Sequence, residues 1–335
     1  MKSYHASSGA GISGLTLKEH DEPKPGAREV LIRMRANSLN FRELMVLRGN
    51  YPLPVKADVV MGADGAGEIV ELGAGVSRVK VGDRVAAAMF PRWIDGPIEW
   101  ECAPQLGGSL DGMFSEYVVL NEEALVHIPE HLSFEEAATL PCAAVTAWNA
   151  LTGGRKLQAG DTVLTLGSGS VSIFALQIAR LFGASVIATT SSDEKANRLK
   201  AVGANSVINY RQTSDWHLTV RDLTGGRGVD QVVEIGGGTL EQSIQSAALN
   251  GQINFIGRLS EAASQIDINL LFGSVATLRV IFAGNRAQFI AMNRAIAVNR
   301  LKPIIDRVFS FEEVVEAFRY YDVAKPVGKI VISHH

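Results

Sequence analysis

Apolar runs alternate with stretches of helical periodicity through the middle of the chain. Residues 162–166 form a short run rich in Val and Leu, which is typical of a strand buried on both faces of a sheet. A glycine-rich turn follows, and apolar residues then recur at roughly helical spacing until Gly183, where we expect the helix to end. Residues 186–189 are apolar again, so the segment predicts a β-α-β unit.

The same alternation continues to about residue 256. The predicted elements after the first unit are helix 193–202, strand 206–209, strand 229–235, helix 239–249 and strand 252–256. Strands that alternate with helices predict a doubly wound parallel sheet with right-handed crossovers. The fold class is therefore α/β, with a Rossmann-type parallel sheet in the middle of the chain.

The flanking parts of the chain have a different pattern. Up to about residue 125, short strand candidates such as 30–36 and 68–72 are separated by Gly and Pro, which predicts an irregular β-rich domain. From Ser133 the chain becomes helical, with Glu136 placed to complete a capping box. The last predicted elements are amphipathic helices at 285–299 and 311–321 and a closing strand at 329–332.

Composition and charge narrow the class of protein. The 335 residues are 47% hydrophobic, which is enough for two buried cores, and the formal net charge is −3. This charge argues against nucleic acid or an anionic membrane surface as the main partner. The chain has no run of 18 apolar residues and no signal-peptide-like apolar core near its start. Its two cysteines do not make a disulfide framework, so we expect a cytoplasmic protein.

The turn after the first central strand carries candidate chemistry. It reads Gly167-Ser168-Gly169-Ser170-Val171-Ser172, a G-x-G-x-x-S pattern. In such a turn the first glycine makes the bend, the second lets the backbone approach a pyrophosphate, and the helix N-terminus offers N–H groups and positive dipole. Glycine turns are common in other roles, so the prediction rests on the strand-turn-helix-strand context. We expect residues 167–171 to bind a dinucleotide.

The end of the second central strand indicates which dinucleotide binds. Sites for NAD usually place a carboxylate there, whereas this chain has Thr190, Ser191 and Ser192, with Lys195 one helical turn further on. Hydroxyls and a lysine suit the 2′-phosphate of NADP(H), which we expect as the cofactor. The alternative is that Ser191 and Glu194 form a capping box and Lys195 is a solvated surface residue.

Several stretches resemble the medium-chain dehydrogenase/reductase superfamily over essentially the whole chain. They are SLNFREL (38–44), RGNYP (48–52), GADGAGEIVELGAGVSRVKVGDRV (62–85), LPCAAVTAWNAL (140–151) and LTGGRGVDQVVE (223–234). The resemblance implies a GroES-like catalytic domain of residues 1–143, completed by 284–335, and a Rossmann NADP-binding domain of residues 144–283.

The resemblance also says where a catalytic zinc would be. In the family's alcohol dehydrogenases a cysteine, a histidine and a second cysteine hold the metal. Here Asn40 stands at the first position, Gly62-Ala63-Asp64 replaces the Gly-His-Glu that carries the histidine, and only Cys142 matches. We therefore expect no metal site, and the chain resembles the zinc-independent branch that contains quinone oxidoreductases and enoyl reductases.

The candidate catalytic residues follow from that branch, in which an Asn and a Tyr at the positions of Asn40 and Tyr51 lie in the active-site cleft. Each has a simpler explanation: Asn40 satisfies backbone groups in a turn, and Tyr51 packs beside Pro52. Arg42 and Glu43 either pair with each other or face solvent.

Further cofactor residues follow from the resemblance and from strand ends. Thr146 corresponds to a position near the nicotinamide, and Tyr210 to one that borders the adenosine phosphate. The remaining candidates follow strands at their carboxyl ends, where ligands bind in doubly wound sheets: Gly236, Phe255, Ile256 and Gly257. The glycines are equally consistent with plain strand termini.

These observations predict an NADPH-dependent, zinc-independent oxidoreductase that transfers hydride to a quinone or a similar conjugated carbonyl substrate. The alternatives are an enoyl-thioester or enone reductase with Tyr51 as proton donor, a non-catalytic NADPH-binding protein, and a zinc-type alcohol dehydrogenase. In the family a strand such as 277–283 pairs across a two-fold axis, so we expect a homodimer. The tryptophan-containing loop 90–108 is expected to be ordered, at the substrate entrance or a subunit contact.

Overall fold

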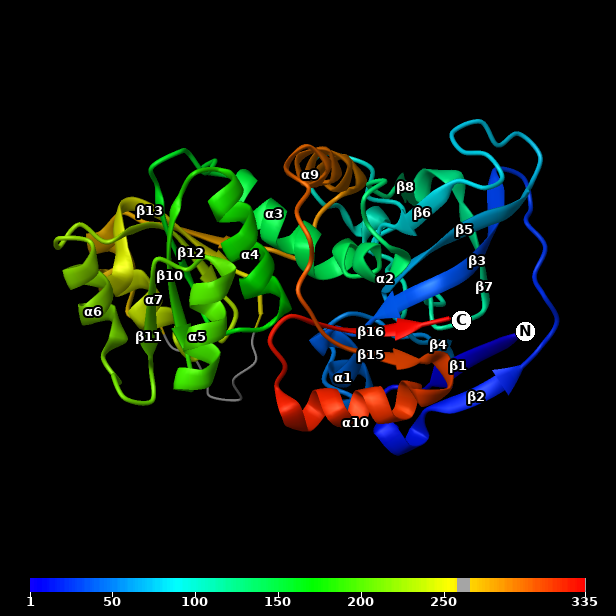
Figure 1. The fold of residues 1–335 in the computed structure, drawn as a ribbon, viewed down its shortest axis with the longest axis horizontal. Helices are drawn as coiled ribbons and strands as arrows, with labels where there is room; N and C mark the ends of the chain where they lie inside the picture. The colour runs from blue at the N-terminus through cyan, green and yellow to red at the C-terminus, as the bar shows by residue number, and fades with distance from the viewer. Residues whose placement is uncertain (258–265, 335) are drawn as a thin grey trace. The chain divides into compact units, whose positions relative to one another are not determined.

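The computed structural model describes residues 1–257 and 266–334 of the chain. The chain divides into two compact units (Figure 1), one of residues 1–145 and 284–335 and the other of residues 146–283. In the described part of the chain no helix is both long and apolar enough to cross a membrane.

The first unit is built on a seven-stranded sheet that the end of the chain completes. Its strands are β3 (Glu29–Ser38), β5 (Asp64–Leu72), β6 (Arg84–Ala87), β7 (Tyr117–Asn121), β8 (Leu125–His127), β15 (Ile305–Ser310) and β16 (Lys329–Ser333). The order is β15-β16-β3-β5-β6-β8, with β7 also paired to β3. Only β15 and β16 are parallel. A second, three-stranded sheet has the order β2 (Thr16–Glu19), β1 (Lys2–Ala6) and β4 (Val59–Val60).

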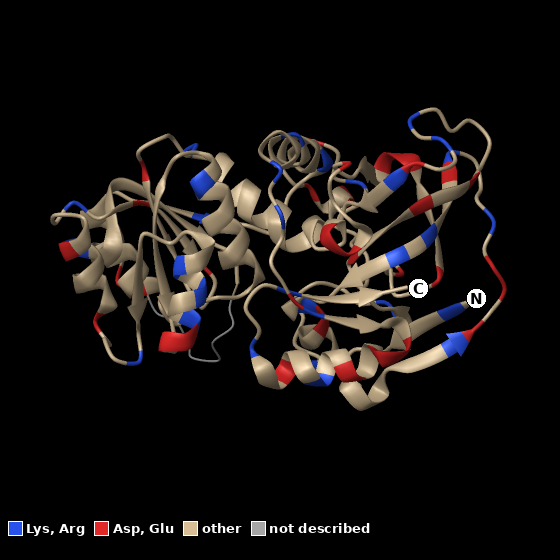
Figure 2. Cartoon of the chain, viewed as in Figure 1, with Lys and Arg blue, Asp and Glu red and all other residues tan. Residues whose placement is uncertain are grey.

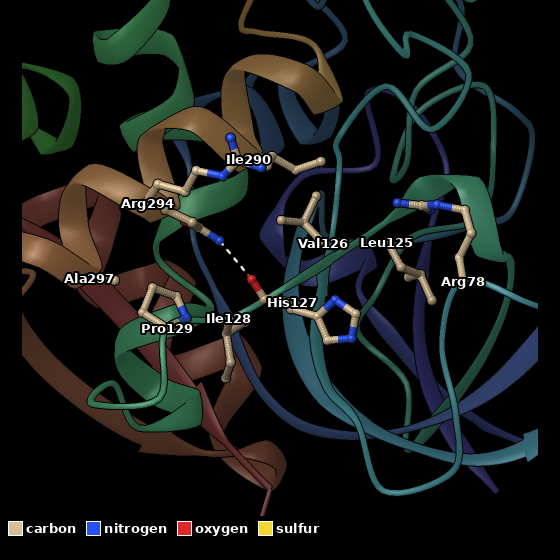
Figure 3. Close-up of a pocket in the computed structure, with 10 residues that line it drawn as sticks. Arg78, Leu125, Val126, His127, Ile128, Pro129, Ile290, Arg294 and Ala297 are labelled. Carbon is tan, nitrogen blue, oxygen red and sulfur yellow. Dashed lines mark hydrogen bonds between the residues drawn. The ribbon is translucent and has the colours of Figure 1, made fainter.

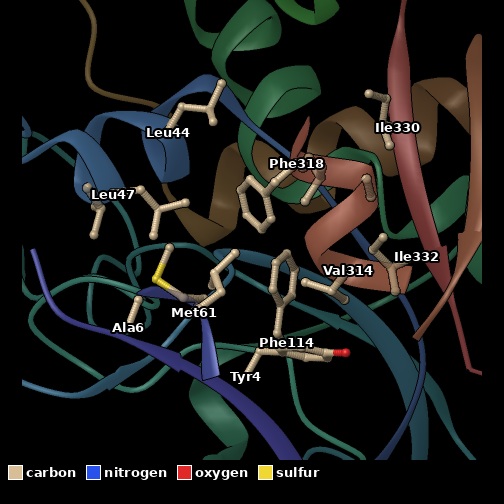
Figure 4. Close-up of a cluster of buried hydrophobic side chains, with 14 of the residues drawn as sticks. Tyr4, Ala6, Leu44, Leu47, Met61, Phe114, Val314, Phe318, Ile330 and Ile332 are labelled. Atoms are coloured by element: carbon tan, nitrogen blue, oxygen red, sulfur yellow. The ribbon is translucent and has the colours of Figure 1, made fainter. Parts of the chain in front are cut away.

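Helices pack against these sheets and close a core. They are α1 (Phe41–Arg48), α2 (Phe134–Ala137), α9 (Arg286–Asn299) and α10 (Val314–Ala324). Leu44, Leu47, Phe114 and Phe318 come from distant parts of the chain and meet in one buried cluster (Figure 4). Strand β16 contributes Ile330 to the same cluster, so the C-terminal strand is anchored beside α1 by apolar packing.

The second unit is a six-stranded parallel sheet, as the alternating pattern predicts. The order is β11 (Ser206–Asn209), β10 (Ser185–Thr190), β9 (Thr162–Thr165), β12 (Val229–Glu234), β13 (Ala247–Phe255) and β14 (Thr277–Val280). Its helices are α3 (Val145–Thr152), α4 (Ser170–Leu181), α5 (Asp193–Val202), α6 (Trp216–Leu223), α7 (Leu240–Ser246) and α8 (Ile268–Ser274). Every residue of β12 is buried, because the strand lies inside the sheet.

Most predicted elements lie within a few residues of the observed ones, and the largest boundary error lies between α7 and β13. Helix α7 ends at Ser246 rather than at 249, and β13 begins at Ala247 rather than at 252. The residues Ala-Ala-Leu favour a helix by themselves, but here Ala247 pairs with Val229 of β12. The pairing then shifts register before Gln252, and Asn250 has a positive φ. The Ser133–Glu136 capping box is confirmed, with both hydrogen bonds present.

Loop 90–108 is ordered by contacts to the start of α9. The backbone N–H groups of Arg286 and Ala287 donate to the carbonyls of Trp93 and Ile94, each at 3.0 Å. Charged residues of both signs are distributed over each unit (Figure 2), and along α10 they alternate rather than forming a face of one sign.

Candidate functional site

The predicted cofactor residues of the second unit gather at one edge of its sheet. Because all six strands are parallel, the segments that follow them lie at the same, carboxyl edge. Residues 167–171 follow β9, residues 190–195 end β10 and begin α5, Tyr210 follows β11, Gly236 follows β12, and residues 255–257 end β13. Thr146 is placed differently: it is buried in the first turn of α3.

The geometry of the glycine turn suits a pyrophosphate. Gly167 has a φ of 75°, a left-handed conformation that favours glycine, and its N–H donates to the Thr189 hydroxyl at 3.2 Å. Gly169 is the N-cap of α4, and a Cβ atom placed on it would meet no other atom within 4 Å. The first turn of α4 contains no acidic side chain, so nothing within it neutralises the helix dipole. These residues therefore fit a dinucleotide.

The structure at the end of β10 shows which serine caps α5. Ser192, not Ser191, caps α5, and its hydroxyl accepts the N–H of Lys195 at 3.3 Å. The alternative of a Ser191–Glu194 capping box is wrong, because Ser192 keeps an extended backbone and the helix begins one residue later than that box requires. The buried Thr190 hydroxyl has no hydrogen-bond partner within the described residues, and the Thr190 carbonyl accepts the N–H of Tyr210 at 2.9 Å.

Glu234 organises the loop after β12, and the sequence reading missed it. Its buried carboxylate accepts the N–H groups of Gly236 and Gly237 at 2.7 and 3.0 Å and the Thr239 hydroxyl at 2.9 Å. The Ile256 N–H donates to the Glu234 carbonyl at 2.9 Å, which ties the ends of β12 and β13 together. A single carboxylate at the end of an apolar strand was the signal available in the sequence.

In the first unit, Asn40 belongs to a buried ionic cluster that the sequence reading also missed. The Lys329 ammonium, at the start of β16, donates to Asn40 Oδ1 at 2.6 Å, to Asp64 Oδ2 at 3.0 Å and to the Leu39 carbonyl at 2.8 Å. Asn40 Nδ2 donates to Asp64 Oδ2 at 2.9 Å. Asn40 is thus the N-cap of α1 and also part of a network that joins three distant segments.

A second ion pair connects this cluster to Tyr51. Arg42 Nη1 donates to Glu43 Oε1 at 2.9 Å, and Glu43 accepts the N–H groups of Asn40 and Ala63 at 2.7 and 3.1 Å. Burial raises the pKa of Glu43, and Arg42 opposes that shift. Arg42 Nε donates to the Tyr51 hydroxyl at 3.3 Å, and its guanidinium lies 4.8 Å from the centre of the Tyr51 ring. Arg42 and Glu43 do pair with each other, and they do not face solvent.

The side chains at the three positions where the family's zinc ligands would be, Asn40, Ala63 and Cys142, do not fit a zinc ion. Burial raises the pKa of the Cys142 thiol and Asp64 raises it further, so the neutral thiol is favoured over the thiolate that binds metals. The neighbouring groups are an amide, a carboxylate already paired with an ammonium, and an alanine in place of a histidine. Within residues 1–257 and 266–334, no three His, Cys, Asp or Glu side chains are grouped so that they could hold a metal ion. Burial and Glu43 also raise the pKa of the nearby phenol of Tyr321.

A pocket of about 300 Å³ lies elsewhere in the first unit (Figure 3). It is lined mainly by β8, the residues after it, and α9, and Asn293 Nδ2 donates to the His127 carbonyl at its wall. None of the predicted site residues lines it, so it does not contribute to the candidate site.

Comparisons with known proteins match both units. Residues 26–130 match the family model of the alcohol dehydrogenase GroES-like domain, and residues 170–297 match that of the zinc-binding dehydrogenases. A zinc-type alcohol dehydrogenase-like protein of Schizosaccharomyces pombe is 41% identical, covering 97% of this chain and 96% of that protein.

Other similar proteins are named for different activities. An acryloyl-coenzyme A reductase of Sulfurisphaera tokodaii is 30% identical over 96% of both chains. A quinone oxidoreductase of Pseudomonas aeruginosa is 34% identical over 78% of this chain and 74% of its own. A crystal structure described as an NAD-dependent alcohol dehydrogenase superposes with a TM-score of 0.90 at 33% identity, covering 99% of each chain.

Proposed function

The chain belongs to the medium-chain dehydrogenase/reductase superfamily, and from this premise we propose that it is an NADPH-dependent oxidoreductase that reduces a quinone or a similar conjugated carbonyl compound without a metal ion. Members of the superfamily use nicotinamide cofactors. The choice of NADPH and the class of acceptor are the proposal.

The buried cluster around Asn40 carries the proposal. Oxidation of an alcohol needs the alcohol ionised, which a zinc ion does as a Lewis acid. The position that would hold the zinc offers an amide, a neutral thiol and an ammonium-paired carboxylate instead. Reduction of a conjugated carbonyl does not need a Lewis acid, because the developing negative charge spreads over the acceptor and ordinary hydrogen-bond donors stabilise it.

Asn40 and Tyr51 carry hydrogen-bond donors that could stabilise the negative charge developing on the acceptor. The Asn40 amide carries two N–H groups, and one of them is used by Asp64. The Tyr51 hydroxyl accepts a hydrogen bond from Arg42, so its own proton is directed elsewhere and is available to an acceptor oxygen. Bound NADPH would supply the hydride, and one proton from Tyr51 or solvent balances the reduction of a quinone to a hydroquinone.

The preference for NADPH rests on the end of β10. Thr190, Ser191 and Ser192 carry hydroxyls, and Lys195 lies in the first turn of α5. Asp193 and Glu194 lie in the same turn and oppose that preference, although Asp193 accepts a hydrogen bond from Asn209 Nδ2 at 2.9 Å. The two cofactors must therefore be compared directly.

A panel assay tests the proposal. Oxidation of NADPH and of NADH is followed with a benzoquinone, a naphthoquinone, an aliphatic enone, an enoyl thioester and a simple aldehyde. We expect turnover of the quinones, with NADPH preferred. Binding of NADPH without turnover of any acceptor would favour a non-catalytic NADPH-binding protein, and aldehyde reduction that follows stoichiometric zinc would favour a zinc-type alcohol dehydrogenase.

A second candidate is reduction of an enoyl thioester or an enone. The Tyr51 hydroxyl favours it, because protonation at carbon needs a positioned acid and Arg42 orients this one. Similarity to the acryloyl-coenzyme A reductase supports it too. Tyr51→Phe separates the candidates: a quinone reductase would keep most of its kcat, whereas an enoyl reductase would lose about 100-fold. Tyr320→Phe, which removes a hydroxyl bonded to Asp306, is the control for general damage.

We also propose a homodimer formed along β14. In the described part of the sheet β14 is the last strand in the order, and Val280 and Phe282 are 61% and 48% exposed. An exposed apolar edge strand presents unpaired backbone groups that can pair with another chain. Light scattering measures the molar mass of the wild type and of Val280→Lys. We expect a dimeric wild type and a weakened dimer in the variant, and a monomeric wild type would contradict the proposal.

A further inference from the structure

Lys329 is a buried cation at the place where zinc-dependent relatives would bind their metal. Its side chain is completely excluded from solvent. An ammonium has three N–H donors, and those of Lys329 have three acceptors: the Leu39 carbonyl, Asn40 Oδ1 and Asp64 Oδ2. All three N–H donors of the Lys329 ammonium therefore have a hydrogen-bond acceptor.

The charges around Lys329 are balanced. Two cations, Arg42 and Lys329, face two carboxylates, Glu43 and Asp64, and all four side chains are buried. Removal of one member of a buried pair leaves an uncompensated charge, which costs far more than loss of an exposed pair. A divalent cation added here would bring two positive charges next to an ammonium that already neutralises Asp64.

We infer that Lys329 is the resident cation of this site: it neutralises Asp64, holds the Asn40 amide in one orientation, and keeps divalent metal ions out even when suitable ligands are supplied. The amide orientation follows from its two partners, since Oδ1 faces the ammonium and Nδ2 faces Asp64. This inference does not depend on the acceptor proposed above, because both of its readouts are independent of activity.

The first readout is a double-mutant cycle on thermal stability. Lys329→Met and Asp64→Asn should each lower Tm by about 6–15 °C, because each leaves one buried charge unpaired. The double variant should lose clearly less than the sum of the two losses, since it has no unpaired charge. The exposed pair Lys56–Asp111, with atoms 2.6 Å apart, gives the matched control cycle, in which small and additive losses are expected. Additive losses at Lys329 and Asp64 would overturn the inference.

The second readout is zinc content. Asn40→Cys together with Ala63→His supplies, with Cys142, the ligand types that zinc-dependent relatives use. The protein is incubated with zinc and desalted, and metal is measured per chain. We expect less than about 0.2 zinc per chain with Lys329 present and about one when Lys329→Met is added.

Equal zinc content in the two engineered proteins, whether high or low, would overturn the inference, as would stoichiometric zinc in the wild type. Lys329→Met alone leaves Asp64 unpaired, so the neutral pair Lys329→Met/Asp64→Asn serves as a second background. Circular dichroism of each variant confirms that a folded protein is being compared.

Discussion

The ionic cluster of the first unit and the glycine turn of the second have opposite electrostatics. The cluster contains two buried carboxylates and two buried cations that satisfy one another. The turn at residues 167–171 contains no charged side chain, and the first turn of α4 contains no acidic residue. A turn of this kind can accept an anionic pyrophosphate, whereas a cluster that is already neutral gains nothing from a further ion.

The contrast separates a region suited to ligand binding from a region that stabilises the fold. In the turn, Gly169 carries no side chain and a Cβ atom placed on it would meet no other protein atom within 4 Å, so we expect a change at Gly169 to affect ligand binding more than the fold. In the cluster, three segments are joined by charged hydrogen bonds, so a change there is felt in stability first. The predictions below separate these two kinds of residue.

The largest effect is expected at Asp64. Asp64→Asn leaves the buried Lys329 ammonium without its carboxylate partner. We expect the free energy of unfolding to fall by about 3–5 kcal/mol. Chemical denaturation measures it. Asp111→Asn removes an exposed partner of Lys56 and should cost less than about 1 kcal/mol. Equal losses of unfolding free energy in Asp64→Asn and Asp111→Asn would show that the buried ion pair stabilises the fold no more than the exposed one.

The next effect is on binding rather than on stability. Gly169→Val places a side chain whose Cβ atom meets no other protein atom but which lies where the pyrophosphate is expected. We predict a Tm lowered by only a few degrees, because valine is a poorer helix cap than glycine, and a Kd for NADPH raised about 100-fold. Gly273→Ala also adds atoms in open space and is the control, with no effect on binding. A Gly169→Val protein that binds NADPH normally would place the cofactor elsewhere.

A smaller effect concerns the pH dependence of the second unit. Burial raises the pKa of Asp230, but hydrogen bonds from Arg227 and from the Thr162 N–H outweigh it, so the pKa lies below its usual value. A depressed carboxyl pKa stabilises the fold above the unfolded value, about 4, and this contribution is lost as pH falls through the folded value.

Asp230→Asn should therefore cost roughly 1 kcal/mol at pH 7 and flatten the loss of stability on acidification. Urea denaturation between pH 3 and 7 measures both, with the exposed Asp222→Asn as control. An unchanged acid profile would mean that Asp230 is not a source of the pH dependence.

The smallest effect tests cofactor choice. Lys195→Gln removes the positive charge in the first turn of α5, just after the hydroxyl residues 190–192. We expect the Kd for NADPH to rise about fivefold and that for NADH to stay the same. Lys200→Gln, in the last turn of the same helix, is the matched control. A parallel rise for both cofactors would show that Lys195 does not read the 2′-phosphate.

The two regions also differ in how far the sequence predicts them. The glycine turn is contiguous, and its strand, turn and helix carry local signals, so the parallel sheet and the helix start could be predicted. The capping residue of α5 was misplaced by one position, because neighbouring serines differ only in backbone conformation. Boundaries such as that between α7 and β13 depend on strand pairing, which local propensity does not contain.

The ionic cluster depends on contacts across most of the chain. Lys329 lies 289 residues from Asn40, and nothing around the predicted closing strand distinguishes it from a lysine at a strand end. The resemblance pointed to Asn40 and Cys142, but the position of the Lys329 ammonium between Asn40 and Asp64 follows only from the packing of β16 beside α1.

Turnover by the metal-stripped protein shows whether the reduction needs a metal ion. The protein is treated with a strong chelator, desalted, and assayed with NADPH and a naphthoquinone before and after zinc is added. We expect the same kcat in all samples, because the proposed site uses hydrogen-bond donors and not a Lewis acid. Activity that disappears on chelation and returns with one zinc per chain would contradict it.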